Sequence, residues 1–234
     1  AQDLHEHGAK TTIVQRGETM VLSIDPAAKL TYGVYQGIPL EDGDLLATTN
    51  TLPVLRTVFQ QITARMVELD RKMIDGLIAK GFKYTMGEDN CGHNMLIRRR
   101  YGGYYLDAGG ADLIIKGEIG LLQFEQIDRF VAEGARLKDG TIVPADLIVL
   151  ATGFVDQAAV ITKLLGEKIA QKVGPVWGIA PDGEMNNMWK RTPQKGLWFI
   201  GGSFANCRIY SRYVALQVKA IEEGLLKFED APFA

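Results

Sequence analysis

Hydrophobic runs, and the glycines that interrupt them, divide the chain into expected strands and helices. The clearest run is Ala145–Phe154 (ADLIVLATGF), in which four consecutive apolar residues lead into the small-residue turn Ala151-Thr152-Gly153. A continuous apolar run of this length favours a strand that is buried on both faces, as in a parallel sheet covered by helices. Ligands of open α/β sheets bind just beyond the carboxyl ends of strands. The pattern therefore predicts a ligand contact at Thr152, Gly153 and Phe154.

The start of the chain has the pattern of the second half of a βαβ unit. Residues 1–7 are expected to end a helix that Gly8 stops, and Lys10–Gln15, rich in β-branched residues, is expected to form a strand. In dinucleotide-binding folds an arginine near the end of the second strand accommodates the 2′-phosphate of NADP. Arg16 occupies that place. The alternative is a solvated arginine at a strand end.

The next stretch is expected to be irregular first and helical afterwards. Residues 25–50 carry Gly, Pro, Asp and Thr throughout, which is typical of irregular structure. Apolar residues three or four apart over Val54–Lys80 predict one long helix or two consecutive ones, stopped by Gly81. The helical stretch is expected to pack against its domain. A lid that faces a substrate is the alternative.

Short strands are expected in the middle of the chain, over residues 82–86, 104–106, 119–124, 127–131, 136–137 and 141–143. A Gly-rich connection is expected over Ala108–Gly120. Asp139-Gly140 is a strong hairpin signal between the last two strands, and Pro144 is expected to end the hairpin. These segments form a β-meander that leads into Ala145–Phe154.

Two clusters of polar residues in this region invite a functional interpretation. Glu88–His93 gathers carboxylate, thiol and imidazole side chains, but the mixed ligand types and loose spacing predict no metal site. Arg98–Arg100 is expected at a solvated strand edge, and a phosphate contact is the alternative.

The last part of the chain is expected to end in a strand, two glycines and a helix. Residues 156–172 are interpreted as helical or irregular, 173–179 as extended, 181–183 as a turn and 184–196 as a loop. Leu197–Ile200 is expected to be a buried strand that ends in Gly201-Gly202. A polar connection, Ser203–Arg212, and a helix over Tyr213–Phe228 follow. This order directs backbone N–H groups and a helix N-terminus at an electron-rich ligand.

Composition narrows the possible classes of function. The 26 Lys and Arg nearly cancel the 28 Asp and Glu, so no charge pattern indicates nucleic acid or an anionic membrane as partner. No apolar run approaches the roughly 20 residues that span a bilayer. The two cysteines form no CxxC pair, which favours a reducing cytoplasm as the location. The chain opens without Met or a signal peptide and in mid-pattern, so we expect a fragment.

Four stretches together resemble the C-terminal part of class B flavin-dependent monooxygenases. This FAD- and NADPH-using family includes the flavin-containing and Baeyer–Villiger monooxygenases. The stretches are AQDLHEHGAKTTIVQR (1–16), GGYYLDAGGADLI (102–114), DGTIVPADLIVLATGF (139–154) and GLWFIGGSFANCRIYSRYVALQVKAIEEGL (196–225). The likeness covers nearly the whole chain. The ATGF stretch with its upstream DG hairpin and the final strand–GG–helix are its most specific parts.

The resemblance implies an α/β fold: an incomplete flavoprotein of two dinucleotide-binding domains. Residues 1–144 would be the remainder of a Rossmann-like NADP-binding domain with a helical insert and the β-meander, and 145–234 the C-terminal segment of the FAD-binding domain. Gln15 and Arg16 would meet the adenine end and 2′-phosphate of NADP. Thr152 and Gly153 would lie near the domain junction.

The resemblance also implies contacts at the flavin and a reaction. Gly201, Gly202 and the helix after them would approach the flavin ring. Arg208 would touch flavin or substrate, with an ordinary surface or ion-pair role as the alternative. In the family NADPH reduces FAD, O2 adds to the reduced flavin to give a peroxyflavin, and this oxygenates a small organic substrate. No catalytic residue is assigned, because the three histidines are too dispersed to form a catalytic group.

The cofactor loops of the family do not occur in this sequence. No G-x-G-x-x-G is present in the 234 residues, so the loops for FAD and NADPH would precede Ala1. The chain alone is expected to hold FAD poorly or not at all. The first expected strand would need a neighbour from an N-terminal piece or from another chain, as in a homo-oligomer. A non-catalytic module of the same fold is the alternative function, and the absence of CxxC disfavours a disulfide reductase.

Overall fold

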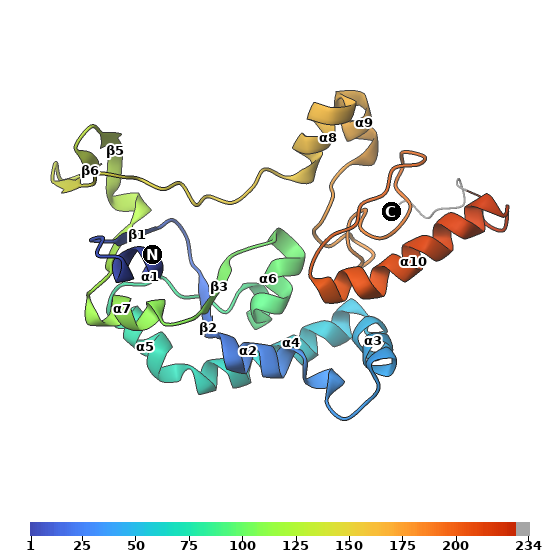
Figure 1. Cartoon of the computed structure of the whole chain (residues 1–234), viewed down its shortest axis with the longest axis horizontal. Helices are drawn as coiled ribbons and strands as arrows, with labels where there is room; N and C mark the ends of the chain where they lie inside the picture. Colours follow the sequence, from blue (N-terminus) through green and yellow to red (C-terminus); the bar gives the residue numbers. More distant parts are fainter. Residues whose placement is uncertain (228–234) are drawn as a thin grey trace. The chain divides into compact units, whose positions relative to one another are not determined.

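The structure is a computed structural model that describes residues 1–227 (Figure 1). The described chain is mixed α/β, as predicted, and it divides into two compact units. Unit 1 comprises residues 1–36, 55–97 and 102–152. Unit 2 comprises residues 37–54, 98–101 and the chain from 153 onward. The expected domain border between residues 144 and 145 and the assignment to a flavoprotein fold stay predictions.

Two pairs of parallel strands form the centre of unit 1. Strand β1 (Thr12–Gln15) pairs with β4 (Gly120–Gln123), and β2 (Met20–Ser23) pairs with β3 (Tyr104–Asp107). The strands predicted at β1, β3 and β4 are confirmed, whereas the pattern does not predict β2. Parallel strands need long crossover connections, which here contain helices.

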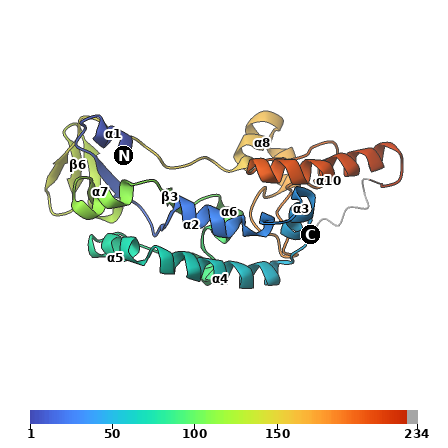
Figure 2. The same cartoon turned by 60° about the horizontal axis from the view of Figure 1, so that its bottom comes forward.

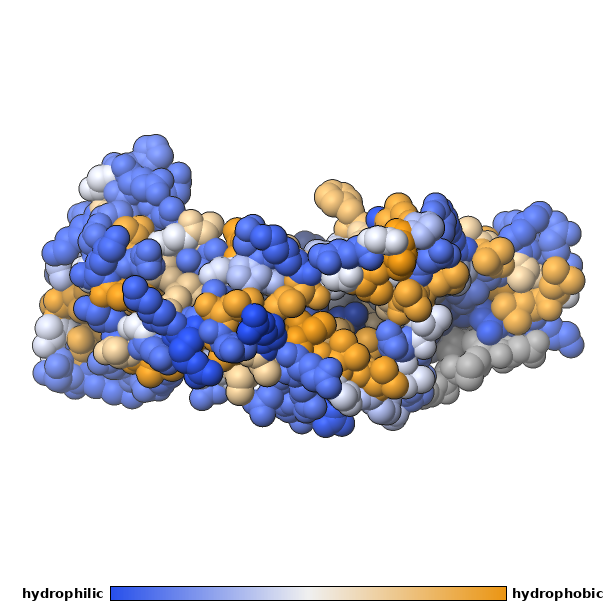
Figure 3. All heavy atoms as spheres, turned by 90° about the horizontal axis from the view of Figure 1, so that it is seen from below, coloured by the Kyte–Doolittle hydropathy of each residue, from blue (hydrophilic) through white to orange (hydrophobic). Residues whose placement is uncertain are grey.

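Helices surround these strands in unit 1 (Figure 1). They are α1 (Gln2–Glu6), α2 (Ile24–Thr31), α4 (Leu52–Leu69), α5 (Arg71–Ala79), α6 (Gly92–Arg100) and α7 (Gly110–Lys116), with 3-10 turns at Gly33–Tyr35, Glu88–Asn90 and Phe124–Gln126; the ends of α4 and α6 belong to unit 2. The prediction of two consecutive helices is confirmed by α4 and α5, which follow one another in Figure 2. Apolar side chains interrupt the polar surface that is seen from below (Figure 3). Leu69 of α4 and Ile78 of α5 are each about half exposed.

Strand β2 has both faces buried in unit 1. Met20 and Leu22 pack into one apolar cluster with residues of α4 and α6, while Val21 packs into a second cluster with residues of α5 and α7. All three side chains are at most 1% exposed. Three successive apolar residues, Met20 to Leu22, are the pattern of a strand covered on both sides.

Several sequence predictions in this region are wrong. Residues 25–50 are not irregular throughout, because they contain α2 and α3 (Leu40–Thr48). Proline is tolerated in the first turn of a helix and acidic residues are favoured there, so Asp25-Pro26 begins a helix where a turn is expected. The connection at Ala108–Gly120 contains α7. Residues 82–86 form only one bridge, between Thr19 and Tyr84.

The predicted β-meander is confirmed in unit 1. Strands β5 (Ile127–Val131), β6 (Gly134–Leu137) and β7 (Ile142–Pro144) are antiparallel neighbours. At the turn before β7, the Asp139 carboxylate accepts a hydrogen bond from the Thr141 N–H at 2.9 Å. This bond is the main cause that lowers the pKa of Asp139.

The expected buried strand at Ala145–Phe154 is wrong. The segment has no helix or strand and appears in Figure 1 as a thin trace between β7 and α8 (Gln157–Leu165). Leu147, Val149 and Leu150 are exposed, and Phe154 is 98% exposed. Among residues 1–227, no strand pairs with this run and no helix covers it. An apolar run forms a buried strand only where neighbours supply both hydrogen bonds and cover.

Unit 2 consists of helices and one long loop. Helices α8, α9 (Glu167–Val173) and α10 (Phe204–Glu222) enclose a loop over residues 174–203, whose Met188 and Trp189 join the apolar core. The Asp156 carboxylate caps α8 by accepting from the Ala159 N–H at 2.8 Å. Of the two alternatives for residues 156–172, helical or irregular, the structure contains the helical one, as α8 and α9. The turn predicted at 181–183 and the following loop are confirmed.

Three predictions fail in unit 2. Residues 203–212 are not a connection: α10 begins at Phe204, because Ser203 is an effective helix cap. The helix predicted over 213–228 is confirmed up to Glu222, and Phe228 lies outside the described residues. Residues 197–200 form no strand, since Phe199 makes one isolated bridge to Met188. Residues 173–179 likewise form no strand, and Ile179 makes one isolated bridge. No helix within the described chain has the length and apolarity that crossing a bilayer requires.

Candidate functional site

The carboxyl end of β1 is fixed by the side chain of Gln15. Its Nε2 donates to the Lys83 carbonyl at 2.8 Å, and its Oε1 accepts from the Lys83 N–H and from Gln123 Nε2, both at 2.9 Å. The side chain is buried. Gln15 therefore ties β1 to β4 and to the loop after α5, and its predicted cofactor contact stays a prediction.

Arg16 lies exposed directly beyond the last paired residue of β1. A guanidinium at the end of a parallel strand matches in its donor chemistry the phosphate that such positions bind. The carboxylate of Glu125, which follows β4, is paired with Lys83 Nζ at 2.6 Å. This hydrogen bond and the Lys83 charge lower the pKa of Glu125. The residues present at this edge thus fit a 2′-phosphate.

The residues predicted to contact a ligand after the apolar run do not enclose a site in the described chain. Thr152, Gly153 and Phe154 are all exposed, in the segment that forms no regular structure. Their own surroundings therefore provide no walls for an isoalloxazine ring. The predicted ligand contact at these residues stays a prediction.

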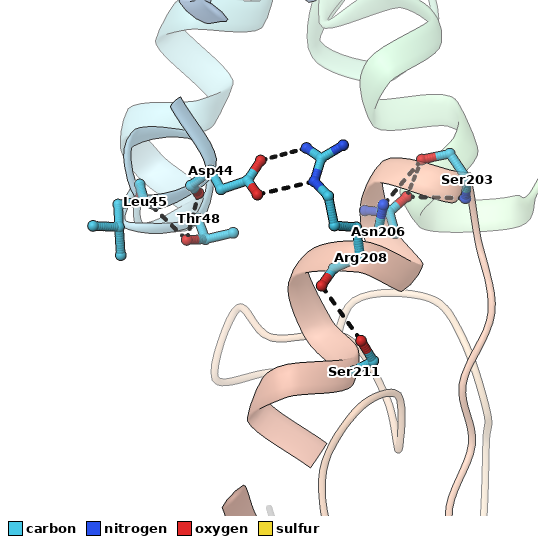
Figure 4. Close-up of polar contacts among 7 residues, drawn as sticks. All are labelled: Asp44, Leu45, Thr48, Ser203, Asn206, Arg208 and Ser211. Atoms are coloured by element: carbon cyan, nitrogen blue, oxygen red, sulfur yellow. Dashed lines mark hydrogen bonds and ion pairs between the residues drawn. The ribbon is translucent and has the colours of Figure 1, made fainter. Parts of the chain in front are cut away.

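Gly201 and Gly202 precede a well-capped helix in unit 2 (Figure 4). The Ser203 Oγ accepts from the Asn206 N–H at 3.2 Å, and the Asn206 Oδ1 accepts from the Ser203 N–H at 3.1 Å. Gly202 has a φ of 98°, and a Cβ there would lie 3.0 Å from Asn206 Oδ1. The capping box therefore favours glycine at 202. The predicted approach of a flavin to this turn stays a prediction.

Arg208 binds a carboxylate that the sequence gives no reason to expect. Its Nε donates to Asp44 Oδ2 at 3.0 Å, and its Nη2 forms a second bond to Asp44 Oδ1, so α10 is joined to α3 within unit 2 (Figure 4). The carboxylate side chain is 12% exposed. Arg208 therefore forms an ion pair, which is the alternative role expected for it, and its predicted contact with flavin or substrate stays a prediction. Asp44 lies in an acidic stretch, Glu41–Asp44, where nothing marks one residue for a distant partner.

The polar cluster at Glu88–His93 is engaged in local contacts. The Cys91 thiol lies 3.6 Å from the Arg56 carbonyl, and the Asp89 carboxylate lies 3.1 Å from the Arg56 guanidinium. His93 Nε2 is 3.3 Å from Thr31 Oγ1. Within residues 1–227, no group of three or more His, Cys, Asp or Glu side chains is arranged to hold a metal ion. Arg98–Arg100 form the end of α6, so the expected strand edge there is wrong.

Two half-buried tyrosines of unit 1 have pKa values far above neutrality. Burial, and secondarily the charge of Asp70, raises the pKa of Tyr84 to about 12. Burial, and secondarily the charge of Asp107, also raises the pKa of Tyr105. Both phenols pack against the apolar clusters around β2 and stay protonated at neutral pH. Neither therefore has the pKa expected of a general base near pH 7.

No model of a known protein family matches this chain, and no curated protein matches it closely enough to count as a relative. The likeness to class B flavin-dependent monooxygenases accordingly depends on the four sequence stretches named above.

Proposed function

We propose that the chain is the C-terminal part of an NADPH- and FAD-dependent monooxygenase that oxygenates a small organic substrate. The sequence stretches that resemble the family support this function. The observation that carries it is the exposed guanidinium of Arg16 directly after a strand with a parallel partner. That is the position at which dinucleotide-binding folds distinguish NADP from NAD.

In this proposal the residues of the chain bind and orient the cofactors. Arg16 holds the 2′-phosphate, and Gln15 fixes the strand end from which Arg16 projects. Gly201 and Gly202 let the backbone approach a ring closely, because they carry no side chain. FAD supplies the oxygen-activating chemistry when it is bound. A reducing cytoplasm suits the two cysteines, which form no disulfide within the described chain.

The 2′-phosphate role is tested by comparing the binding of NADPH and of NADH to the complete enzyme and to its Arg16→Ala variant by isothermal titration. A charge-assisted hydrogen bond contributes about 1.5–3 kcal/mol, so we expect roughly 10- to 100-fold weaker NADPH binding and unchanged NADH binding. Arg129→Ala is the matched control, because Arg129 is an exposed arginine elsewhere in unit 1. Equal loss for both nucleotides would exclude this role for Arg16.

A non-catalytic module of the same fold is the second candidate function. The exposure of Leu147–Phe154 favours it, because the residues predicted to contact a ligand there enclose nothing. The two candidates differ in flavin binding. We would incubate the chain with FAD, remove unbound flavin, and record absorbance near about 450 nm, where flavin itself absorbs. Retained flavin excludes the module, and a colourless protein shows that this chain alone is no flavoenzyme.

A further inference from the structure

Five aromatic side chains of unit 2 contact one another in a continuous series. They are, in order of contact, Tyr101, Trp177, Trp189, Tyr210 and Tyr213, with ring centroids 4.4–6.1 Å apart at each step. Trp177 and Trp189 come from the loop between α9 and α10, and both tyrosines at the end of the series come from α10. Trp189 and Tyr210 stack with ring centroids 4.4 Å apart and an interplanar angle of 19°.

Three of these aromatic residues have an unfavourable backbone conformation. The φ angles are 57° at Tyr101, 71° at Trp177 and 56° at Trp189. Bulky residues rarely adopt this left-handed region, because the side chain crowds its own carbonyl. Such residues persist where surrounding structure holds them, and they gather at ligand-binding sites. The strain in unit 2 is concentrated at the residues of the aromatic series.

The indole N–H of Trp189 lacks a hydrogen-bond partner in the described chain. Its Nε1–H is buried and has no acceptor among residues 1–227, and the residue is 9% exposed. Most buried polar groups in proteins are hydrogen-bonded, so an exception calls for a reason. A phenylalanine would avoid the unpaired donor. Trp189 therefore lowers the stability of unit 2 in two ways: its backbone has an unfavourable positive φ, and its buried indole N–H is unpaired.

A cavity of about 220 Å³ opens at the same place. The rings of Trp189, Tyr210 and Tyr213 and two methionine side chains line it, and Glu184 and Lys190 are its charged residues. Pockets for drug-sized ligands have roughly 300–1,000 Å³, so this cavity suits a single small group. Aromatic faces carry negative electrostatic potential and thioethers are polarizable, which favours a diffuse positive charge.

The charged residues of the cavity point to the same kind of ligand. Lys190 Nζ lies 3.9 Å from the Asp182 carboxylate, whereas Glu184 has no ion-pair partner in the described part of the chain. Glu184 acts electrostatically on Tyr210, one of the rings that line the cavity. Burial is the main cause that raises the pKa of Tyr210. The charge of Arg98 lowers this pKa, and the charge of Glu184 raises it. Arg98 is not among the residues that line the cavity.

We propose that this cavity binds a quaternary ammonium group, with its methyl groups against Trp189, Tyr210 and Tyr213 and its charge compensated by Glu184. Aromatic rings around a desolvated cation are the recurring solution for such groups. A quaternary ammonium has no N–H to donate, so the aromatic and thioether walls leave none of its polar groups unpaired. The group belongs either to a free small molecule or to a trimethylated lysine of another protein. The site is independent of the proposed oxygenation.

The test is a titration of the chain with choline, followed by tryptophan fluorescence and by isothermal titration. The uncharged carbon analogue, in which a tert-butyl group replaces the trimethylammonium, is the ligand control. We expect choline to bind at least about tenfold more tightly than the analogue. Glu184→Gln is expected to weaken choline binding by a similar factor. Glu222→Gln, an equal change of charge on the exposed side of α10, is expected to leave it unchanged.

Further variants separate a lost site from a misfolded unit. Tyr213→Leu removes one ring at the end of the series and is expected to weaken choline binding with an unchanged far-ultraviolet circular dichroism spectrum. A peptide carrying trimethyl-lysine identifies the source of the group: tighter binding than choline assigns a protein partner, and weaker binding assigns a small molecule. Equal binding of choline and its carbon analogue, an unaltered affinity in Glu184→Gln, or no choline binding at tens of millimolar would overturn the proposal.

Discussion

Two apolar segments of unit 1, Met20–Ser23 and Leu147–Leu150, have similar composition and opposite surroundings. The first forms β2, pairs with β3 and has its apolar residues at most 1% exposed. The second forms no strand, and Leu147, Val149 and Leu150 are each more than half exposed. Hydrophobicity therefore does not decide which segment is a strand. The presence of a neighbouring strand and of covering helices decides it.

The same contrast separates the two proposed cofactor regions. The strand that precedes Arg16 has a partner, and Gln15 locks its end. The segment that precedes Thr152–Phe154 has neither pairing nor cover in the described chain. We therefore expect an ordered binding position at the end of β1 and no preformed ligand site at Thr152–Phe154. Each experiment below compares the two segments or the residues around them.

Truncating one leucine in each segment is expected to give the largest difference in the free energy of unfolding between two matched variants. Leu22→Ala removes a fully buried side chain and leaves a cavity, so it should lower the free energy of unfolding by about 2–5 kcal/mol. Leu150→Ala, the same change at an exposed position, should alter it by less than about 0.5 kcal/mol. Denaturant titration gives both values. Similar losses in the two variants would mean that Leu150 is buried in solution.

Gln15 and Arg16 are adjacent residues with different expected effects on stability. Gln15→Ala leaves the Lys83 N–H without its acceptor and removes one of the two hydrogen bonds that the Lys83 carbonyl accepts, which should lower the free energy of unfolding by about 1–3 kcal/mol. Arg16→Ala should change it by less than about 0.5 kcal/mol. Thermal or denaturant unfolding distinguishes the two. A larger effect at Arg16 would show that its guanidinium has a structural role.

Alkaline pH is expected to destabilise the clusters around β2 through Tyr84. Its pKa is raised by burial to about 12 in the folded state, against about 10 when unfolded. Between these values the unfolded tyrosine loses its proton while the folded one keeps it. Stability is therefore complete below pH 10 and falls above it by about 1.4 kcal/mol per pH unit for this group.

Tyr84→Phe provides the control for the alkaline loss. The Tyr84 hydroxyl is buried with no hydrogen-bond partner in residues 1–227, so its removal should leave neutral-pH stability equal or higher. The variant should lose less stability than the unmodified chain between pH 10 and 12 in urea titrations. Parallel curves for the two proteins would show that the phenol is solvated.

Local patterns in the sequence predict much of this fold. Three predicted features depend only on residues close together in the sequence, and the structure contains all three. They are the helical spacing over Val54–Lys80, the β-branched strand that ends at Gln15 and the Asp139-Gly140 hairpin. Turn-forming residues mislead where they begin helices, as at Asp25-Pro26 and Ser203. The apolar run at Leu147–Leu150 misleads because its structure depends on segments far away in the sequence.

Contacts at the candidate sites are less accessible from the sequence. The bond between Arg208 and Asp44 joins residues 164 positions apart, and the bonds of Gln15 reach Lys83 and Gln123. No rule based on the spacing of residues predicts such long-range pairs from a single sequence. The aromatic cavity around Trp189 is equally non-local, since its rings come from a loop and a helix that each look ordinary alone.

Hydrogen–deuterium exchange followed by mass spectrometry tests the contrast between the two apolar segments most directly. Peptides covering Met20–Ser23 should stay protected, because their amides are hydrogen-bonded to the β3 region and buried. Peptides covering Leu147–Leu150 should exchange at the rate of an unstructured chain at the earliest time points. Equal protection of the two segments would contradict the account, because Leu147–Leu150 would then be a paired and covered strand.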